Sequence, residues 1–177
     1  DEGAVDSGVE PGVEPGVEPG EPIEDVDPLT LPSGDAPCRP PVLVTVLDAL
    51  DGDTLDVQSV DWGWERVRLI GVDTPEMGGS SAPTECYAAE AKAFMQTFEG
   101  QKAWLTFDGQ CTDRYDRTLA YVHLGDGGKD FIERRLLRQG YAYDAPYADT
   151  ATFADVFQRD ETYARDNQQG IWDRCVE

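Results

Sequence analysis

Arg-Leu-Ile-Gly-Val-Asp-Thr-Pro-Glu, residues 68–76, is the stretch around which the rest of the chain is organised. The apolar run from Leu69 to Val72 is typical of a buried strand. The strand should end before Pro75, because proline has no amide hydrogen with which to continue a ladder and pushes Thr74 into an extended conformation. An arginine at one end and two carboxylates at the other suit the joint binding of a phosphate and a hard cation. The same residues also fit an ordinary strand with a capped exit loop.

The segments on either side of this stretch predict a small β structure with helices added. Asp51-Gly52 is a strong turn signal between two strand-like segments, which predicts a hairpin. Strands are predicted over residues 42–50, 54–60, 64–72, 104–107 and 118–124, and helices over 85–99, 131–139 and 151–167. Five strands with helices between and after them predict an α+β fold built on a small barrel.

Residues 1–37 differ in composition from the rest of the chain. They contain three consecutive Gly-Val-Glu-Pro repeats, residues 8–19, followed by Gly-Glu-Pro. Proline at every fourth position prevents both helix and sheet, and the few valines cannot build a core. We therefore expect a disordered, extended tether of the kind that separates a working domain from an anchor, or else an unselected low-complexity tail.

The charge of the chain argues against a generally basic nucleic-acid-binding surface. The formal net charge is −22, from 36 acidic and 14 basic side chains. Residues 1–37 carry 11 acidic and no basic side chains, which leaves 25 acidic and 14 basic side chains, a net charge of −11, on the rest. A polyanion would need a local basic cleft, a bound cation, or both.

The four cysteines are widely separated, without the C-x-x-C spacing of zinc or redox sites. An even number without metal spacing favours disulfides over free buried thiols, and hence an oxidising compartment. No apolar run approaches the length of a membrane span, and no signal peptide is visible. We expect a secreted, cell-surface or periplasmic protein.

Five motifs together make residues 42–172 resemble the staphylococcal (micrococcal) nuclease family, whose thermonucleases carry them in the same order. The motifs lie at residues 51–54, 68–76, 112–117, 137–140 and 170–172. Each is weak alone, but five in order at compatible spacing are specific. The resemblance implies a five-stranded OB-type β-barrel with three helices over residues 38–177. It also implies a calcium-dependent nuclease that cleaves DNA and RNA and leaves 3′-phosphate ends.

The resemblance assigns a metal site to Asp53, Asp73 and the backbone carbonyl of Thr74. Calcium takes six to eight oxygen ligands, so two carboxylates, a carbonyl and water leave room for a phosphate oxygen. Asp51 resembles a neighbouring acid that orients the site through water, although an Asp-Gly turn residue needs no such role.

The resemblance also assigns the catalytic groups. Glu76 matches the general base that activates the attacking water, and Arg68 and Arg117 match the two arginines that hold the scissile phosphate. A guanidinium pairs with two phosphate oxygens at once and remains charged throughout the reaction. Such donors stabilise the charge that builds on the five-coordinate phosphorus more than they stabilise the ground state.

Further substrate contacts are implied at Arg114 and Tyr115, which match residues that contact the neighbouring phosphate. An exposed Arg-Tyr pair also fits solvated surface. The family stacks a tyrosine on the base from the loop after the second helix. Tyr143 and Tyr147 are both available there, and we assign Tyr147 although the register differs from that of the family by one residue.

The sequence departs from the family in three places. Asp116 replaces a small turn residue and puts a negative charge beside Arg117. The loop at residues 78–81 reads Gly-Gly-Ser-Ser where lysines are expected. The surface is acidic, so substrate binding should depend more on the cation. None of these changes removes a catalytic group.

The implied fold also suggests how the cysteines pair and what His123 does. Four cysteines allow three connectivities. We favour Cys86 with Cys111, which would brace the two catalytic loops, and Cys38 with Cys175, which would close nearly the whole domain. His123 lies on a strand without a catalytic partner in reach and is interpreted as structural.

Two other functions compete with the nuclease. One is a catalytically silent OB-fold module that binds nucleic acid or a protein, but silent members of the family usually lack the glutamate or an arginine, and both are present here. The other is a calcium-dependent phosphodiesterase with a non-nucleic substrate, which a salt titration would distinguish. For the nuclease, we expect DNA and RNA as substrates, a monomer, and no stable protein partner.

Overall fold

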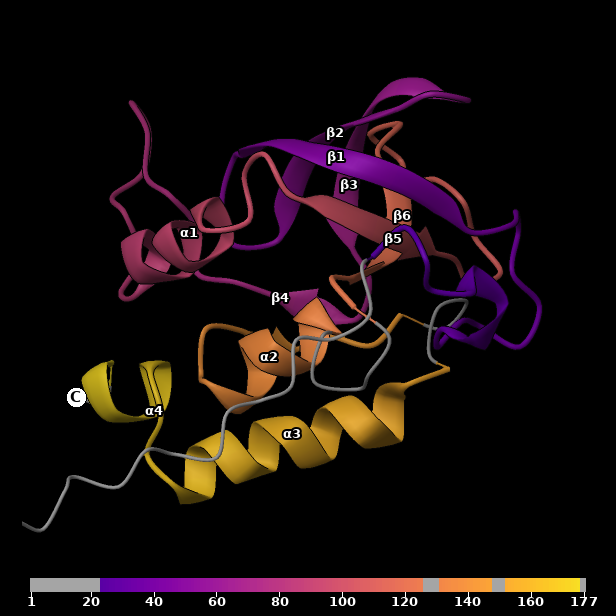
Figure 1. The fold of residues 1–177 in the computed structure, drawn as a ribbon. Coiled ribbons are helices and arrows are strands. Elements are labelled where there is room, and N and C mark those ends of the chain that lie inside the picture. The colour runs from indigo at the N-terminus through magenta and orange to yellow at the C-terminus, as the bar shows by residue number, and fades with distance from the viewer. Residues whose placement is uncertain (1–22, 126–130, 148–151, 176–177) are drawn as a thin grey trace, which may run out of the picture.

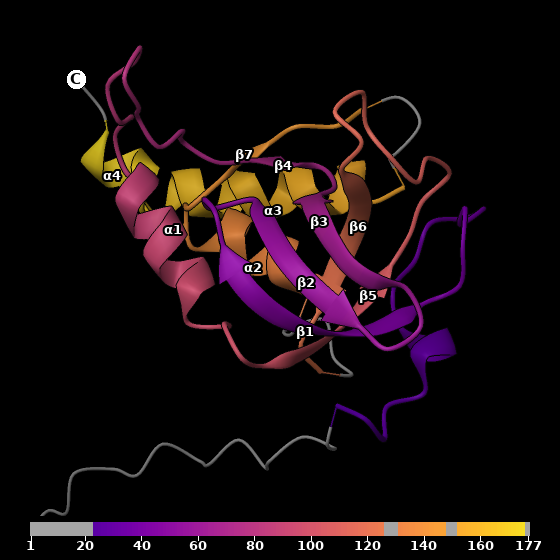
Figure 2. The ribbon, with the colours of Figure 1, turned by 90° about the horizontal axis from the view of Figure 1, so that it is seen from above.

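The computed structural model describes residues 23–125, 131–147 and 152–175 of the chain. Five strands close into a barrel in the order β1-β2-β3-β6-β5, as Figures 1 and 2 show. These strands are β1 (Val42–Ala49), β2 (Thr54–Ser59), β3 (Gly63–Leu69), β5 (Lys102–Thr106) and β6 (Thr118–His123). All neighbours are antiparallel except β3 and β6, which run parallel. The five-stranded barrel predicted from the sequence is confirmed.

The barrel interior is filled by alternate side chains of its strands. On β1, for example, Val42, Val44 and Val46 are buried while the residues between them are partly exposed, as expected when side chains alternate across a sheet. Val67 and Leu69 of β3 also point into this core and are fully buried. The opposite face of β3 therefore carries Arg68, which reaches the functional site.

The predicted third strand ends earlier than expected and is followed by a separate short strand. Gly71 has φ +77°, a conformation that side-chain-bearing residues rarely adopt. A Cβ there would also lie 2.7 Å from the ring of Phe157. The chain turns at this glycine, and β4 (Val72–Asp73) pairs instead with β7 (Tyr143–Asp144).

Three helices pack on the barrel at the predicted places. They are α1 (Ala88–Gln96), α2 (Ile132–Arg138) and α3 (Ala154–Asp166), and a short α4 (Ile171–Arg174) follows them. In Figure 1, α2 and α3 lie in a layer beneath the barrel, with α1 at one end. The buried Asp160 of α3 joins the two lower helices by accepting hydrogen bonds from Arg134 at 2.6 Å and Arg138 at 3.0 Å. None of the helices in the described segments is long and apolar enough to cross a membrane.

Residues 23–37 were assigned to the disordered tether, and the structure corrects this boundary. Val26 and Leu31 are buried at 3% and 5% exposure. The backbone carbonyls of Ile23 and Pro32 accept hydrogen bonds from Trp104 Nε1 at 2.8 Å and Thr106 Oγ1 at 2.6 Å. The segment therefore packs along β5, through contacts with residues more than 70 positions away. The repeats at 8–19 lie outside the described residues.

The predicted disulfide connectivity is wrong. The structure joins Cys38 to Cys111 and Cys86 to Cys175, with Cα–Cα distances of 5.7 and 5.8 Å. Cys38 donates its backbone amide to Asp108 O at 2.8 Å, which holds it beside the loop that leaves β5 and carries Cys111. At the other end, Cys86 lies just before α1 and Cys175 directly follows α4, and Figure 2 shows these two helices at the same end of the molecule.

Candidate active site

A buried carboxylate, Asp53, forms one side of the candidate site. It follows the β1–β2 turn and is 3% exposed. Its Oδ2 accepts hydrogen bonds from the backbone amide and Oγ1 of Thr74, at 2.8 and 3.1 Å. Asp51 Oδ1 accepts the backbone amide of Asp53 at 3.0 Å and so holds the turn. Gly52 is required here, because a Cβ would lie 2.7 Å from the Thr74 side chain.

Arg68 joins this turn to the start of the Asp-Thr-Pro-Glu segment. Its Nη1 donates to the carbonyls of Leu69 and Val72, both at 2.7 Å. Its Nη2 lies 3.2 Å from Asp53 Oδ2 and 3.1 Å from Asp73 Oδ1. The side chain is only 9% exposed, and its four oxygen contacts fix the plane of the guanidinium. The structure thus brings together the arginine and two carboxylates that the sequence placed in one site.

Burial and mutual repulsion raise the pKa values of two acids in this region. Burial raises the pKa of Asp53 to about 6, with a contribution from Asp51, although Arg68 and the Thr74 hydrogen bonds lower it. Burial also raises the pKa of Glu76, with further contributions from Asp51 and Asp73. Glu76 therefore lies in the electrostatic field of the same acidic turn.

The position of Glu76 is fixed by the base of the loop that follows it. Its backbone amide donates to Glu85 Oε2 at 2.8 Å, and its carbonyl accepts the Glu85 amide at 3.0 Å. These two bonds close the loop over residues 77–84, the stretch that lacks the expected lysines. The Glu76 carboxylate itself is largely exposed to solvent, where it can meet a water molecule.

The acidic turn has the donor chemistry that calcium prefers. Asp53 and Asp73 converge on one guanidinium nitrogen, and Asp51 lies close enough to raise the pKa of Asp53. In the described part of the chain, no group of three or more His, Cys, Asp or Glu side chains is arranged to hold a metal alone. Hard cations accept carbonyl, water and phosphate oxygens beside carboxylates, so Asp53 and Asp73 could form part of such a site.

Arg117 is held by an aspartate that the sequence analysis did not single out. Asp113 Oδ2 accepts Arg117 Nε at 2.7 Å, and Asp113 Oδ1 accepts the backbone amides of Tyr115 and Arg117 at 2.9 and 3.0 Å. Burial acts to raise the pKa of Asp113, but these hydrogen bonds lower it overall. The spacing of four residues to Arg117, in a loop that must turn, was the available signal.

Asp116, which the sequence analysis placed beside Arg117, is a turn residue in this loop. Its φ of +62° puts it in the left-handed region, where glycine is unstrained and aspartate is tolerated better than most residues. Its amide donates to the Asp113 carbonyl at 3.1 Å to complete the turn. The family's small residue at this position is therefore explained by backbone conformation.

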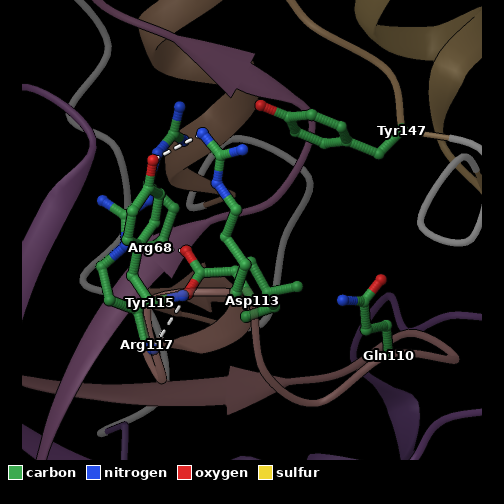
Figure 3. A pocket seen from close by; sticks show the side chains of 8 residues that line it. Arg68, Gln110, Asp113, Tyr115, Arg117 and Tyr147 are labelled. Atoms are coloured by element: carbon green, nitrogen blue, oxygen red, sulfur yellow. Dashed lines mark hydrogen bonds and ion pairs between the residues drawn. The ribbon is translucent and has the colours of Figure 1, made fainter.

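A pocket of about 450 Å³ unites the predicted phosphate-binding side chains (Figure 3). Its lining comprises Arg68, Gln110, Asp113, Arg114, Tyr115, Arg117, Leu119 and Tyr147. Five of these were singled out in the sequence, whereas Gln110, Asp113 and Leu119 were not. The predicted metal ligands and Glu76 are absent from the lining and adjoin it through Arg68.

The structure distinguishes the two tyrosines that the sequence offered for base stacking. Tyr147 lines the pocket and is 56% exposed, and Figure 3 shows its ring at the pocket edge. Tyr143 instead lies in β7, opposite Asp73, and packs edge-on against Trp172 at 5.5 Å. Tyr147 is thus placed where a base could stack. On the other wall, the Arg114 guanidinium lies 4.7 Å from the Tyr115 ring centroid and donates to its hydroxyl.

His123 lies away from this pocket. It is fully buried, and its Nε2 is 2.9 Å from Thr106 Oγ1. Its ring packs against Phe131 with 4.6 Å between centroids. Burial lowers the pKa of His123 to about 4. These contacts match the structural interpretation made from the sequence.

Comparison with known proteins identifies the family of the chain. The sequence model of the family described as staphylococcal nuclease homologue matches residues 66–174. The chain is 34% identical over 128 residues to the thermonuclease of Staphylococcus hyicus, covering 72% of this chain and 73% of that protein. It is 35% identical over 126 residues to the thermonuclease of Staphylococcus intermedius, covering 71% and 73%. It is also 28% identical over 144 residues to endonuclease Htp3 of Saprolegnia parasitica, covering 72% and 68%. The chain therefore belongs to the staphylococcal nuclease family.

Proposed function

We propose that the chain is a calcium-dependent nuclease that hydrolyses phosphodiester bonds in DNA and RNA. The observation that carries this proposal is the pocket shared by Arg68 and Arg117, in which Arg68 also contacts Asp53 and Asp73. Two guanidinium groups and an adjoining acidic turn suit one phosphate and one hard cation. The relatives named as thermonucleases and an endonuclease support the same chemistry.

The substrate would lie with its scissile phosphate between the two arginines. Asp113 orients Arg117, and the carbonyls of Leu69 and Val72 orient Arg68. Because both side chains are already held in place, substrate binding costs little of their conformational entropy. Arg114 and Tyr115 would contact the neighbouring phosphate, and Tyr147 would stack on a base. Because every base offers a π-face, this stacking would tolerate many sequences.

Glu76 would act as the general base. It takes a proton from a water molecule, whose oxygen attacks phosphorus opposite the leaving 5′-oxygen. The bond from phosphorus to the 5′-oxygen breaks, that oxygen takes a proton from solvent to become a 5′-hydroxyl, and the other product keeps a 3′-phosphate. The raised pKa of Glu76 brings it closer to the operating pH, which favours a general base. The arginines then donate to the phosphate oxygens whose negative charge increases in the transition state.

Asp53, Asp73 and the Thr74 carbonyl would hold the calcium, with Asp51 nearby. A calcium ion bound there supplies positive charge to a phosphate oxygen and lowers the pKa of a bound water. The raised pKa of Asp53 supports this assignment, because burial and Asp51 leave a carboxylate that a cation would stabilise.

The two disulfides favour an oxidising location, so we propose that the protein is secreted or displayed at the cell surface or in the periplasm. A monomer suffices for this chemistry, because every residue named above comes from one chain.

The test is hydrolysis of single-stranded DNA and RNA by the purified protein with calcium and with chelator, using wild type and Glu76→Gln. We expect cleavage that requires calcium, yields 3′-phosphate ends and falls by about two to four orders of magnitude in Glu76→Gln. The matched control is Glu90→Gln, which removes the charge of an exposed acid on α1, outside the loop that positions Glu76. Binding without cleavage by the wild type would instead indicate a silent binding module.

A further inference from the structure

A second pocket adjoins the candidate active site, on the other side of Tyr115 and Arg117. Its volume is about 500 Å³, within the range usual for ligand sites. Tyr115 and Arg117 line both pockets, so these two side chains lie between them. The far wall is formed by Trp64 and Arg66 of β3.

The wall on β3 continues directly from the arginine of the candidate active site. Trp64, Arg66 and Arg68 occupy alternate positions of β3, so their side chains leave the same face of the strand, and Val67 between the two arginines points into the barrel core. Trp64 is four residues from Arg68, about 13 Å at 3.3 Å per residue. The parallel pairing of Val67 with Thr118 brings the Arg117 loop alongside this face.

The second pocket is suited to a flat, uncharged group. The Trp64 ring is 56% exposed, with the Arg66 guanidinium 5.6 Å from its centroid. Arg66 is already paired with Asp56 at 2.7 Å, and Arg117 with Asp113 at 2.7 Å. Glu65 of the lining is also paired, with Arg39 at 2.8 Å, and Asp116 adds a further negative charge. A phosphate would gain little there, whereas the neutral face of a nucleobase would stack on the indole.

We propose that Trp64 is a stacking platform for a base of the same single strand, beyond the nucleotides that the first pocket holds. This inference rests on the proposed nuclease function and extends its binding site. Arg66 positions the platform, because Asp56 holds its guanidinium near the indole ring. The platform makes affinity depend on substrate length, since only a strand longer than the first pocket can reach it.

The experiment compares a deoxyadenylate octamer with the dimer, each titrated calorimetrically into the full chain carrying Glu76→Gln, with calcium present. Adding Trp64→Ala should weaken octamer binding by about 5- to 150-fold and affect the dimer much less. Trp64→Phe should restore most of the octamer affinity, because it keeps an aromatic face. In the catalytically active background, Trp64→Ala should raise KM for the octamer more than it lowers kcat.

Trp62→Ala is the matched control. Trp62 is similarly exposed, at 53%, and has its own arginine, Arg39, 4.9 Å from its ring, but it lines a different surface hollow. Equal octamer affinities for Trp64→Ala and Trp62→Ala would overturn the proposal, as would an equal loss for dimer and octamer.

These outcomes separate the platform from the nuclease function. A wild type that cleaves, combined with a Trp64→Ala variant that binds the octamer normally, refutes the platform alone. A wild type that binds but does not cleave refutes the nuclease, and the octamer titration still decides the platform. Absence of any oligonucleotide binding refutes both.

Discussion

Asp113→Asn is the sharpest test of how the structure prepares Arg117 for phosphate binding. Asparagine keeps an oxygen that can accept the backbone amides of Tyr115 and Arg117, so the turn should persist. It replaces Oδ2, the acceptor of Arg117 Nε at 2.7 Å, with an amide nitrogen that cannot accept a hydrogen bond. The substitution therefore removes one contact and leaves the loop in place.

The expected loss follows from what that contact does. Complete removal of a transition-state donor typically costs about 10²- to 10³-fold in rate. Arg117 keeps its charge and its position 5.4 Å from the Tyr115 ring centroid, so only its orientation is relaxed. We expect kcat/KM to fall by about 10- to 100-fold. The pair is partly exposed, so unfolding should become easier by at most about 1 kcal/mol.

The assay is cleavage of single-stranded DNA at saturating calcium, together with thermal unfolding of each variant. Asp116→Asn is the control, because it removes the same charge three residues away and asparagine tolerates the positive φ. Asp113, not Asp116, accepts Arg117 Nε, so Asp116→Asn removes only a nearby negative charge and should raise the affinity for the phosphate. If both variants change kcat/KM alike, Asp113 acts only through its charge and the positioning argument is refuted.

Three further predictions concern stability. Replacing Cys86 and Cys175 with serine opens a loop with a sequence separation of 89. Because the unfolded chain then gains conformational entropy, the free energy of unfolding should fall by about 4 to 5 kcal/mol and Tm by roughly 10 to 20 °C. An unchanged Tm would argue against this pairing. Deleting residues 1–37 should destabilise the protein by up to about 3 to 6 kcal/mol relative to deleting residues 1–22, because it exposes the sites covered by Val26 and Leu31. Equal denaturant midpoints for the two truncations would show that residues 23–37 do not stabilise the domain and belong to the tether. Burial lowers the pKa of His123 from 6.5 to about 4 in the folded protein. The contribution of the neutral, buried His123 to the free energy of unfolding is therefore fully present above pH 6.5 and is lost as the pH falls towards 4. Relative to His123→Gln, the wild type should lose about 3 kcal/mol of unfolding free energy between pH 7 and pH 4, and parallel pH profiles would contradict the assignment.

Much of the site was visible in the sequence because its determinants are local. The Asp-Gly-Asp turn, the end of a buried strand at Asp-Thr-Pro-Glu and the loop before Arg117 each depend on neighbours along the chain. Turn residues, proline and alternating apolar side chains act over a few positions, so they can be recognised without tertiary information. The barrel strands and the three main helices followed from the same patterns.

The errors share a different cause. The sequence suggested two wrong disulfides and a tether that was too long, since both depend on which distant surfaces meet. Cys38 is brought to Cys111 because residues 23–38 run along β5, and Cys86 meets Cys175 because the fold brings the segment before α1 to the end of α4. Valine and leucine in an acidic, proline-rich segment carry no sign of burial until β5 provides the surface.

What the sequence alone determined is the family, the barrel and the identity of the groups suited to phosphate and cation chemistry. Tertiary structure alone decided that Asp113 holds Arg117, that Tyr147 rather than Tyr143 borders the pocket, and that Trp64 lies on the same strand face as Arg68 beside a second pocket. The physical reason is that a residue's chemistry is local to its side chain. Its hydrogen-bond partners and exposure are set by segments that only the folded chain brings together.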